Sequence, residues 1–139
     1  MISLEDKWEI AELLARFTQC SDYGDWAGLG ELYTPEIETE MEGIAIRYSG
    51  IEGQIEHAKD SDSHAQGKNR HFNFNLTITE EGGEVFANYA FMNVNAGHAA
   101  MTAQIVVTGR MRDTVVKTAA GWKIARRFVR FDQSVEITS

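Results

Sequence analysis

The sequence predicts an α+β fold in which N-terminal helices pack on one face of a strongly curved antiparallel sheet. Apolar residues recur at helical spacing near the start of the chain, and from residue 71 onward they alternate with polar residues, as in half-buried strands. Helices therefore come first and a long antiparallel meander follows. Because the chain has 139 residues and no repeat, low-complexity tract or proline-rich linker, we expect one domain over residues 1–139.

The first predicted element is an amphipathic helix. Ser3, followed three residues later by Asp6, resembles a capping box at its start. Gly24 is expected to end it, because glycine is common just after a helix. One apolar stripe follows the helical repeat: Ile10, Leu13, Leu14, Phe17 and Cys20.

Short elements are predicted between this helix and the main sheet. They are a helix over 26–33 that stops at Pro35, strands over 37–42 and 44–49 that meet near Gly43, a weaker helix over 50–60, and a polar loop over 61–69. Asp25 is expected to cap the helix over 26–33.

The second half of the chain predicts four strands. In "HFNFNLTI" the strict alternation directs two sets of side chains to opposite faces: Phe72, Phe74, Leu76 and Ile78 on one, and His71, Asn73, Asn75 and Thr77 on the other. Three long strands follow over 84–95, 99–118 and 121–135. Strands of this length usually need bulges, so we expect Gly97 and Gly109 to be bend points.

Composition excludes several classes of function. A formal charge of −8 and a pI near 4.9 argue against nucleic-acid binding and against attraction to an anionic membrane. No apolar run is long enough for a membrane helix, and "MISLEDKWEI" lacks the features of a secretory signal. The single cysteine, Cys20, rules out an internal disulfide and fits a reducing cytoplasm. We therefore expect a cytoplasmic protein.

Three motifs resemble the SnoaL-like branch of the NTF2-like superfamily. They are "D-x-x-D-W-x-x-L-x-x-L-Y-T-P" from Asp22, "R-H-F-x-x-N-L" from Arg70, and "G-W-K-I-A-R-R" from Gly121. The resemblance covers nearly the whole chain and is weakest over 44–68. It implies an NTF2-like (cystatin-like) cone, a bent antiparallel sheet wrapped around helices with a deep pocket at the wide end.

Within that superfamily the pattern is most similar to scytalone dehydratase and hexachlorocyclohexane dehydrochlorinase. The resemblance implies a catalytic pair in which His71 is the base and Asp22 orients it. The chemistry is reasonable because imidazole titrates near neutral pH and a carboxylate on its second nitrogen fixes the tautomer. It implies no metal or cofactor, and the sequence has no H-E-x-x-H motif, cysteine cluster or phosphate-binding glycine loop.

The sequence departs from scytalone dehydratase where that enzyme polarises its substrate carbonyl. Its two water-holding tyrosines fall at Ser21 and Met41, and its second histidine falls near Tyr89 or Ala90. Tyr23, Tyr48 and Tyr89 are candidate replacements, and Asn75 is a further candidate for substrate binding. Apolar residues near this region, Met41, Phe91 and Met92, suit a small hydrophobic substrate, cyclic or aromatic.

Other interpretations stay open. Asp22 has a local role as a helix-end residue, and His71 as a solvated strand residue. On the same scaffold, a polyketide cyclase or a ketosteroid-type isomerase would use Asp22 directly as the base. A non-catalytic ligand-binding or assembly subunit, like a dioxygenase β chain, is the third possibility.

The remaining histidines and the outer sheet face complete the expectations. His57 and His64 are candidates for the pocket mouth, whereas His98 lies in a predicted turn. The arginines of "RMR" and "RRFVR" are interpreted as solvated strand residues. Apolar side chains such as Ile105 and Val107 on the outer face, and Trp8 outside the helix stripe, indicate a homodimer or homotrimer.

Overall fold

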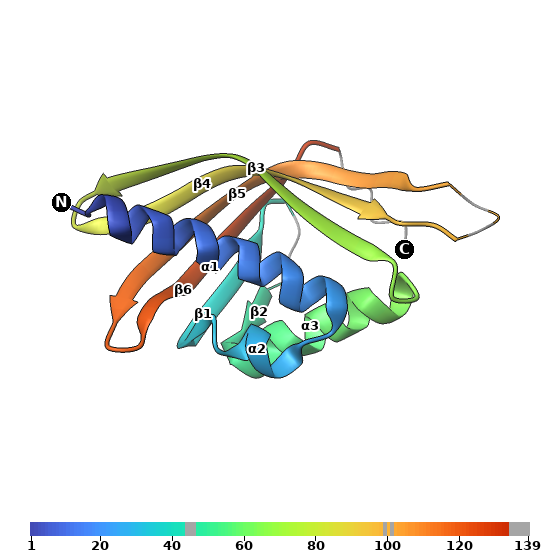
Figure 1. The fold of residues 1–139 in the computed structure, drawn as a ribbon, viewed down its shortest axis with the longest axis horizontal. Helices are drawn as coiled ribbons and strands as arrows, with labels where there is room; N and C mark the ends of the chain where they lie inside the picture. Colours follow the sequence, from blue (N-terminus) through green and yellow to red (C-terminus); the bar gives the residue numbers. More distant parts are fainter. Residues whose placement is uncertain (44–46, 99, 101, 134–139) are drawn as a thin grey trace.

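The computed structural model describes residues 1–43, 47–98, 100 and 102–133, and it has the predicted α+β architecture (Figure 1). In this part of the chain, six strands form one sheet in the order β2-β1-β6-β5-β4-β3. In chain order the elements are α1 (Leu4–Tyr23), α2 (Trp26–Gly30), β1 (Tyr33–Met41), β2 (Arg47–Ser49), α3 (Gly50–His64), β3 (Asn69–Glu81), β4 (Glu84–Asn95), β5 (Gln104–Thr118) and β6 (Gly121–Phe131). None of the described helices has the length and apolar character needed to cross a bilayer.

Helix α1 forms as the sequence predicts. The Ser3 hydroxyl accepts from the Asp6 amide at 3.0 Å and the Asp6 carboxylate accepts from the Ser3 amide at 3.0 Å, so the capping box is complete. Gly24 ends the helix in the left-handed region, with φ of 72°. The apolar stripe faces the sheet, which α1 crosses obliquely in Figure 1, and the buried core contains Ile10, Leu13, Leu14, Leu29, Ile37, Ala87, Val115 and Ile124.

The second helix is shorter than predicted. Asp25 caps it by accepting from the Gly28 amide at 3.0 Å, but the helix ends at Gly30 and Tyr33 already belongs to β1. Two glycines in five residues weaken the helix. Pro35 does not stop it; this proline lies inside β1, where the register against β6 shifts and a missing N–H is tolerated.

Helix α3 is longer than predicted. It continues to His64, so the polar segment expected over 61–69 is helical in its first part and is already β3 at Asn69. The predicted strand residues 44–46, 99, 101, 134 and 135 lie outside the described part of the chain.

A bulge in β3 overturns the predicted single alternation. The register against β4 shifts between Phe74 and Thr77, and Asn75 has φ of 58°. Phe72 and Phe74 therefore remain 45% and 43% exposed, whereas Leu76 and Ile78 pack on the core. Before the bulge His71 and Asn73 face inward, and after it Leu76 and Ile78 do.

The two predicted bend points differ. Gly97 adopts φ of 74° in the left-handed region, two residues after β4 ends. Gly109 stays in register with Phe131, but a Cβ there would overlap the Arg130 carbonyl oxygen and the Phe91 ring. Its role is close packing rather than bending.

Candidate active site

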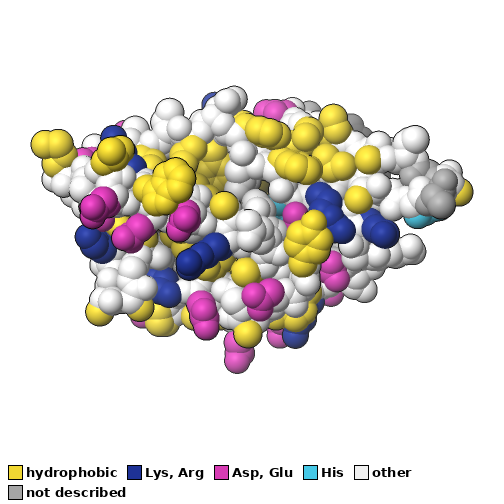
Figure 2. Space-filling model, in the orientation of Figure 1, with side chains coloured by type: hydrophobic (Ala, Val, Ile, Leu, Met, Phe, Trp, Pro, Cys, Tyr) yellow, Lys and Arg dark blue, Asp and Glu magenta, His cyan; other side chains and the backbone are white. Residues whose placement is uncertain are grey.

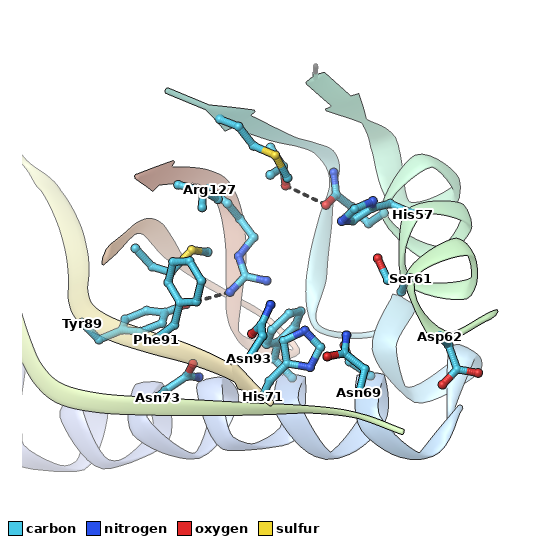
Figure 3. A pocket seen from close by; sticks show the side chains of 18 of the residues that line it. His57, Ser61, Asp62, Asn69, His71, Asn73, Tyr89, Phe91, Asn93 and Arg127 are labelled. Atoms are coloured by element: carbon cyan, nitrogen blue, oxygen red, sulfur yellow. Dashed lines mark hydrogen bonds between the residues drawn. The ribbon is translucent and has the colours of Figure 1, made fainter. Parts of the chain in front are cut away.

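A cavity of about 130 Å³ lies between the concave face of the sheet, the end of α1 and helix α3 (Figure 3). Much of its lining is aromatic or apolar: Phe17, Met41, Phe91, Met111, Val129 and Phe131. The prediction of an apolar pocket with Met41 and Phe91 is thus met, whereas Met92 is not among the lining residues. Such a cavity favours a small, largely apolar ligand.

Asp22 and His71, which are 49 positions apart, lie in direct contact. Nδ1 of His71 is 2.6 Å from Oδ1 of Asp22. The backbone amide of His71 also donates to both carboxylate oxygens, at 3.1 and 3.0 Å. Asp22 is buried, with 9% of its surface exposed. Its carboxylate therefore makes its three hydrogen-bond contacts to His71 away from bulk solvent.

This contact determines how the imidazole is presented. An ionised carboxylate only accepts hydrogen bonds, so Nδ1 carries a hydrogen and donates it to Asp22. Nε2 makes no hydrogen bond within the described part of the chain, and the His71 ring lies at the cavity (Figure 3). The Phe17 ring packs edge-on against the imidazole, with centroids 5.8 Å apart, and limits its rotation.

Arg127 forms the centre of a buried network that the sequence interpretation missed. Its Nε and Nη2 donate to the two Asp113 oxygens at 3.0 and 3.1 Å, and Nη2 also donates to the Tyr89 hydroxyl at 2.7 Å. Tyr89 in turn donates to Asp113 at 2.5 Å. The guanidinium also stacks 3.9 Å from the centre of the Phe17 ring.

This network keeps Arg127 charged. Burial by itself would lower the pKa of Arg127, but the Asp113 carboxylate and the neighbouring Tyr89 hold it well above the ordinary value. Burial raises the pKa of Tyr89 well above its usual 10.0. A charged guanidinium paired with the Asp113 carboxylate, and a neutral phenol, therefore lie at the cavity.

The sequence prediction that the arginines of "RRFVR" are solvated strand residues is wrong for Arg127. The β5–β6 register shifts between Thr114 and Val115, with one extra residue on β6 between Ile124 and Arg126. Arg127 consequently turns inward, and only 3% of its surface is exposed. A bulge-inducing signal is not evident in "WKIARRF".

Helix α3 contributes a second histidine to the cavity. His57 lines it and stacks on Tyr48, with ring centroids 3.9 Å apart. Burial lowers the pKa of His57 below the usual 6.5, and the nearby Asp60 only partly opposes this shift. His64 and His98 are exposed, so neither lies in the cavity.

The predicted substrate-binding residues Tyr89, Tyr48 and Asn75 have different positions. Tyr89 lines the cavity, but its hydroxyl is engaged by Arg127 and Asp113. Tyr48 lies behind His57 and is not among the lining residues. Asn75 is exposed at the β3 bulge, outside the cavity. In the described residues, no group of three or more His, Cys, Asp or Glu side chains is placed to hold a metal ion.

Comparison with known proteins identifies the family. The SnoaL-like domain model matches residues 3–128, so the chain belongs to the SnoaL-like family. This fold includes cofactor-independent cyclases, isomerases and dehydratases. No curated protein matches the chain.

Solved structures support the same assignment. An NTF2-like protein with a cystatin-like fold from Novosphingobium aromaticivorans is 28% identical, with a TM-score of 0.82 over 94% of this chain and 85% of that one. Aln2 from a Streptomyces species is 22% identical, with a TM-score of 0.83 over 95% and 94%. ActVI-ORFA from Streptomyces coelicolor is 18% identical, with a TM-score of 0.78 over 91% and 97%. The fold is NTF2-like, as predicted.

Proposed function

We propose that the protein is a cofactor-independent, dehydratase-like lyase whose general base is Nε2 of His71. The observation that carries this proposal is the 2.6 Å contact between His71 Nδ1 and the buried Asp22 carboxylate at the cavity. A histidine oriented by a carboxylate is a common acid–base device. The resemblance in sequence motifs supports the same pair.

The proposed reaction removes water from a β-hydroxy carbonyl compound. Nε2 takes a proton from the carbon beside the carbonyl, and Asp22 stabilises the imidazolium that forms. The electron pair forms a carbon–carbon double bond as the bond to the β-hydroxyl breaks. The leaving hydroxide takes the proton back from His71, so the products are a conjugated enone, water and the starting enzyme.

Two features of the cavity favour this step. The Arg127 guanidinium, which lines the cavity, lowers the energy of negative charge that develops on the substrate. The apolar lining suits a small hydrophobic substrate, cyclic or aromatic. Both features are supplied by the protein's own side chains, so the proposed step needs no cofactor.

An isomerase or cyclase with Asp22 as the direct base fits the geometry less well. Asp22 is not among the cavity-lining residues, and its oxygens accept hydrogen bonds from the ring and amide of His71. A carboxylate in that position has poor access to a substrate proton. A non-catalytic binding subunit would not need the oriented imidazole.

The test uses 3-hydroxycyclohexanone as a probe, because its dehydration product absorbs in the ultraviolet. We expect His71→Gln to lower kcat/KM by about 10²–10⁴-fold and Asp22→Asn to lower it by a similar order. His64→Gln is the matched control, because that histidine is exposed at the end of α3. A wild type without turnover on this ketone and its ring-substituted relatives, or unchanged turnover in His71→Gln, contradicts the proposal. Loss in Asp22→Asn alone would instead make the carboxylate the base.

We also propose that the protein forms a homodimer or homotrimer. We place it in a reducing cytoplasm, and the single Cys20 supports that location. Hydrophobic side chains gather on the visible surface over α1 and along β3 (Figure 2). Exposed hydrophobic side chains include Leu4 at 84% and Trp8 at 68% on α1, Phe72 at 45% on β3, and Ile105 at 65% and Val106 at 62% on β5. Light scattering tests the assembly: a mass equal to the 15.6 kDa chain would contradict it.

A further inference from the structure

Two buried polar atoms at the cavity, Ser21 Oγ and Asn93 Oδ1, have no hydrogen-bond partner among the described residues. A buried polar group left unpaired is destabilising, so native proteins rarely keep one without a reason. Ser21 is only 7% exposed. Two such atoms at one cavity point to a ligand group that pairs with them.

Both atoms flank the Asp22–His71 pair. In the β3–β4 register Asn93 is directly opposite His71, and such cross-strand neighbours have Cβ atoms about 4.5–5.5 Å apart. Figure 3 shows the Asn93 amide beside the His71 ring. Ser21 precedes Asp22 in α1 and reaches the same cavity. Whatever binds these atoms therefore lies next to the proposed base.

We infer that Asn93 and Ser21 form a hydroxyl-binding subsite that holds the leaving hydroxyl of the substrate beside His71. This inference rests on the proposed function. The substrate hydroxyl donates to Asn93 Oδ1, and the Ser21 hydroxyl donates to the oxygen of the substrate hydroxyl. A hydroxyl group fits because it both donates and accepts. An ether oxygen or a carboxylate cannot donate, so either would leave Asn93 Oδ1 unpaired.

The subsite also has a chemical consequence. A donor from Ser21 stabilises negative charge on the departing oxygen, and the nearby imidazolium of His71 can return its proton to it. The subsite thus selects substrates hydroxylated at the β carbon. It predicts discrimination against the same skeleton with a methoxy group, although both compounds yield the same enone.

The first experiment compares 3-hydroxycyclohexanone with 3-methoxycyclohexanone, which lose water and methanol respectively. We expect the wild type to prefer the hydroxy compound at least about tenfold in kcat/KM, because a site built to pair with a hydroxyl rejects analogues that lack it. Asn93→Leu should reduce the preference to less than about threefold. Asn88→Leu is the matched control: Asn88 is also on β4 but hydrogen-bonds Thr79 outside the cavity.

The outcomes separate the two proposals. If the wild type converts both ketones equally well and His71→Gln abolishes both reactions, the lyase assignment holds and the hydroxyl subsite is wrong. If Asn93→Leu keeps the wild-type preference, the subsite is also wrong. If neither ketone reacts, the lyase assignment fails for this substrate class. The thermal unfolding midpoint of Asn93→Leu then tests the subsite by itself.

The second experiment measures the thermal unfolding midpoint without any ligand. Asn93→Leu removes an unpaired buried polar group, so we expect a midpoint equal to or above that of the wild type. A residue kept only for the fold would behave in the opposite way. A midpoint clearly below the wild type would show that the amide has a structural partner, and it would overturn the inference.

Discussion

Polar groups at the bottom and at the side of the cavity differ in how completely they are hydrogen-bonded. At the bottom, Tyr89, Asp113 and Arg127 satisfy one another through four hydrogen bonds in the buried interior. At the side, Ser21 and Asn93 present atoms that no described residue pairs, around an imidazole whose hydrogen bonds to described residues use one ring nitrogen. The saturated network is an ion pair with a phenol, and we expect it to stabilise the fold. The unsaturated side is available to a ligand, which is where we place the chemistry.

The largest predicted effect comes from breaking the network at the bottom. Asp113→Ala leaves the Arg127 guanidinium buried without its counter-ion, and we expect a loss of about 3–5 kcal/mol in the free energy of unfolding. Urea unfolding measures the loss. The exposed neighbour provides the control, since Arg126→Met should change stability by less than about 0.5 kcal/mol. A loss below about 1 kcal/mol in Asp113→Ala would mean that the network is not a stabilising element.

A companion variant sharpens that result. Replacing both partners, as Asp113→Leu with Arg127→Met, removes the stranded charge and should recover most of the stability. The same double variant should still have slow elimination, because the fixed positive charge is gone. If the double variant recovers both stability and elimination rate, the Arg127 charge does not contribute to catalysis.

A smaller effect is expected at the β3 bulge, which turns His71 toward the cavity. Asn75 has φ of 58°, a conformation that costs a β-branched residue about 1–2 kcal/mol. Asn75→Val should therefore lower the urea midpoint, whereas Asn75→Gly should leave it nearly unchanged. Equal midpoints for the two variants would indicate that the bulge is not strained.

The smallest predicted effect is the pH response of His57. Because its pKa is lowered in the folded chain, the unfolded chain binds more protons once the pH falls below about 6.5. Stability should therefore decrease as the pH drops from 6.5 toward the folded-state pKa. His57→Gln should flatten this part of the curve of unfolding free energy against pH. An identical slope in wild type and variant would contradict the assignment of this response to His57.

Sequence patterns predicted the features that local chemistry determines. The capping box at Ser3, the Gly24 helix end and the order of helices before strands follow from backbone geometry alone. The contact between Asp22 and His71 was anticipated from a motif resemblance. Their catalytic role stays a prediction, because the geometry alone does not establish a reaction.

The parts that were wrong depend on bulges and tertiary contacts. One extra residue on β6 shifts its alternation, so Arg127, predicted to be solvated, is buried in the core. The β3 bulge likewise puts Asn75 outside the cavity and separates Phe72 from Leu76. A periodicity of two cannot reveal these shifts, because each is determined by pairing with a neighbouring strand.

In the proposed mechanism, Asp22 holds His71 with Nδ1 protonated and Nε2 presented to the substrate. Nitrogen-15 NMR of histidine-labelled protein, with the signal assigned through His71→Gln, reads this tautomer directly in the neutral imidazole. We expect the Nδ1–H form in the wild type and its loss in Asp22→Leu. A neutral His71 protonated on Nε2 in the wild type would contradict it.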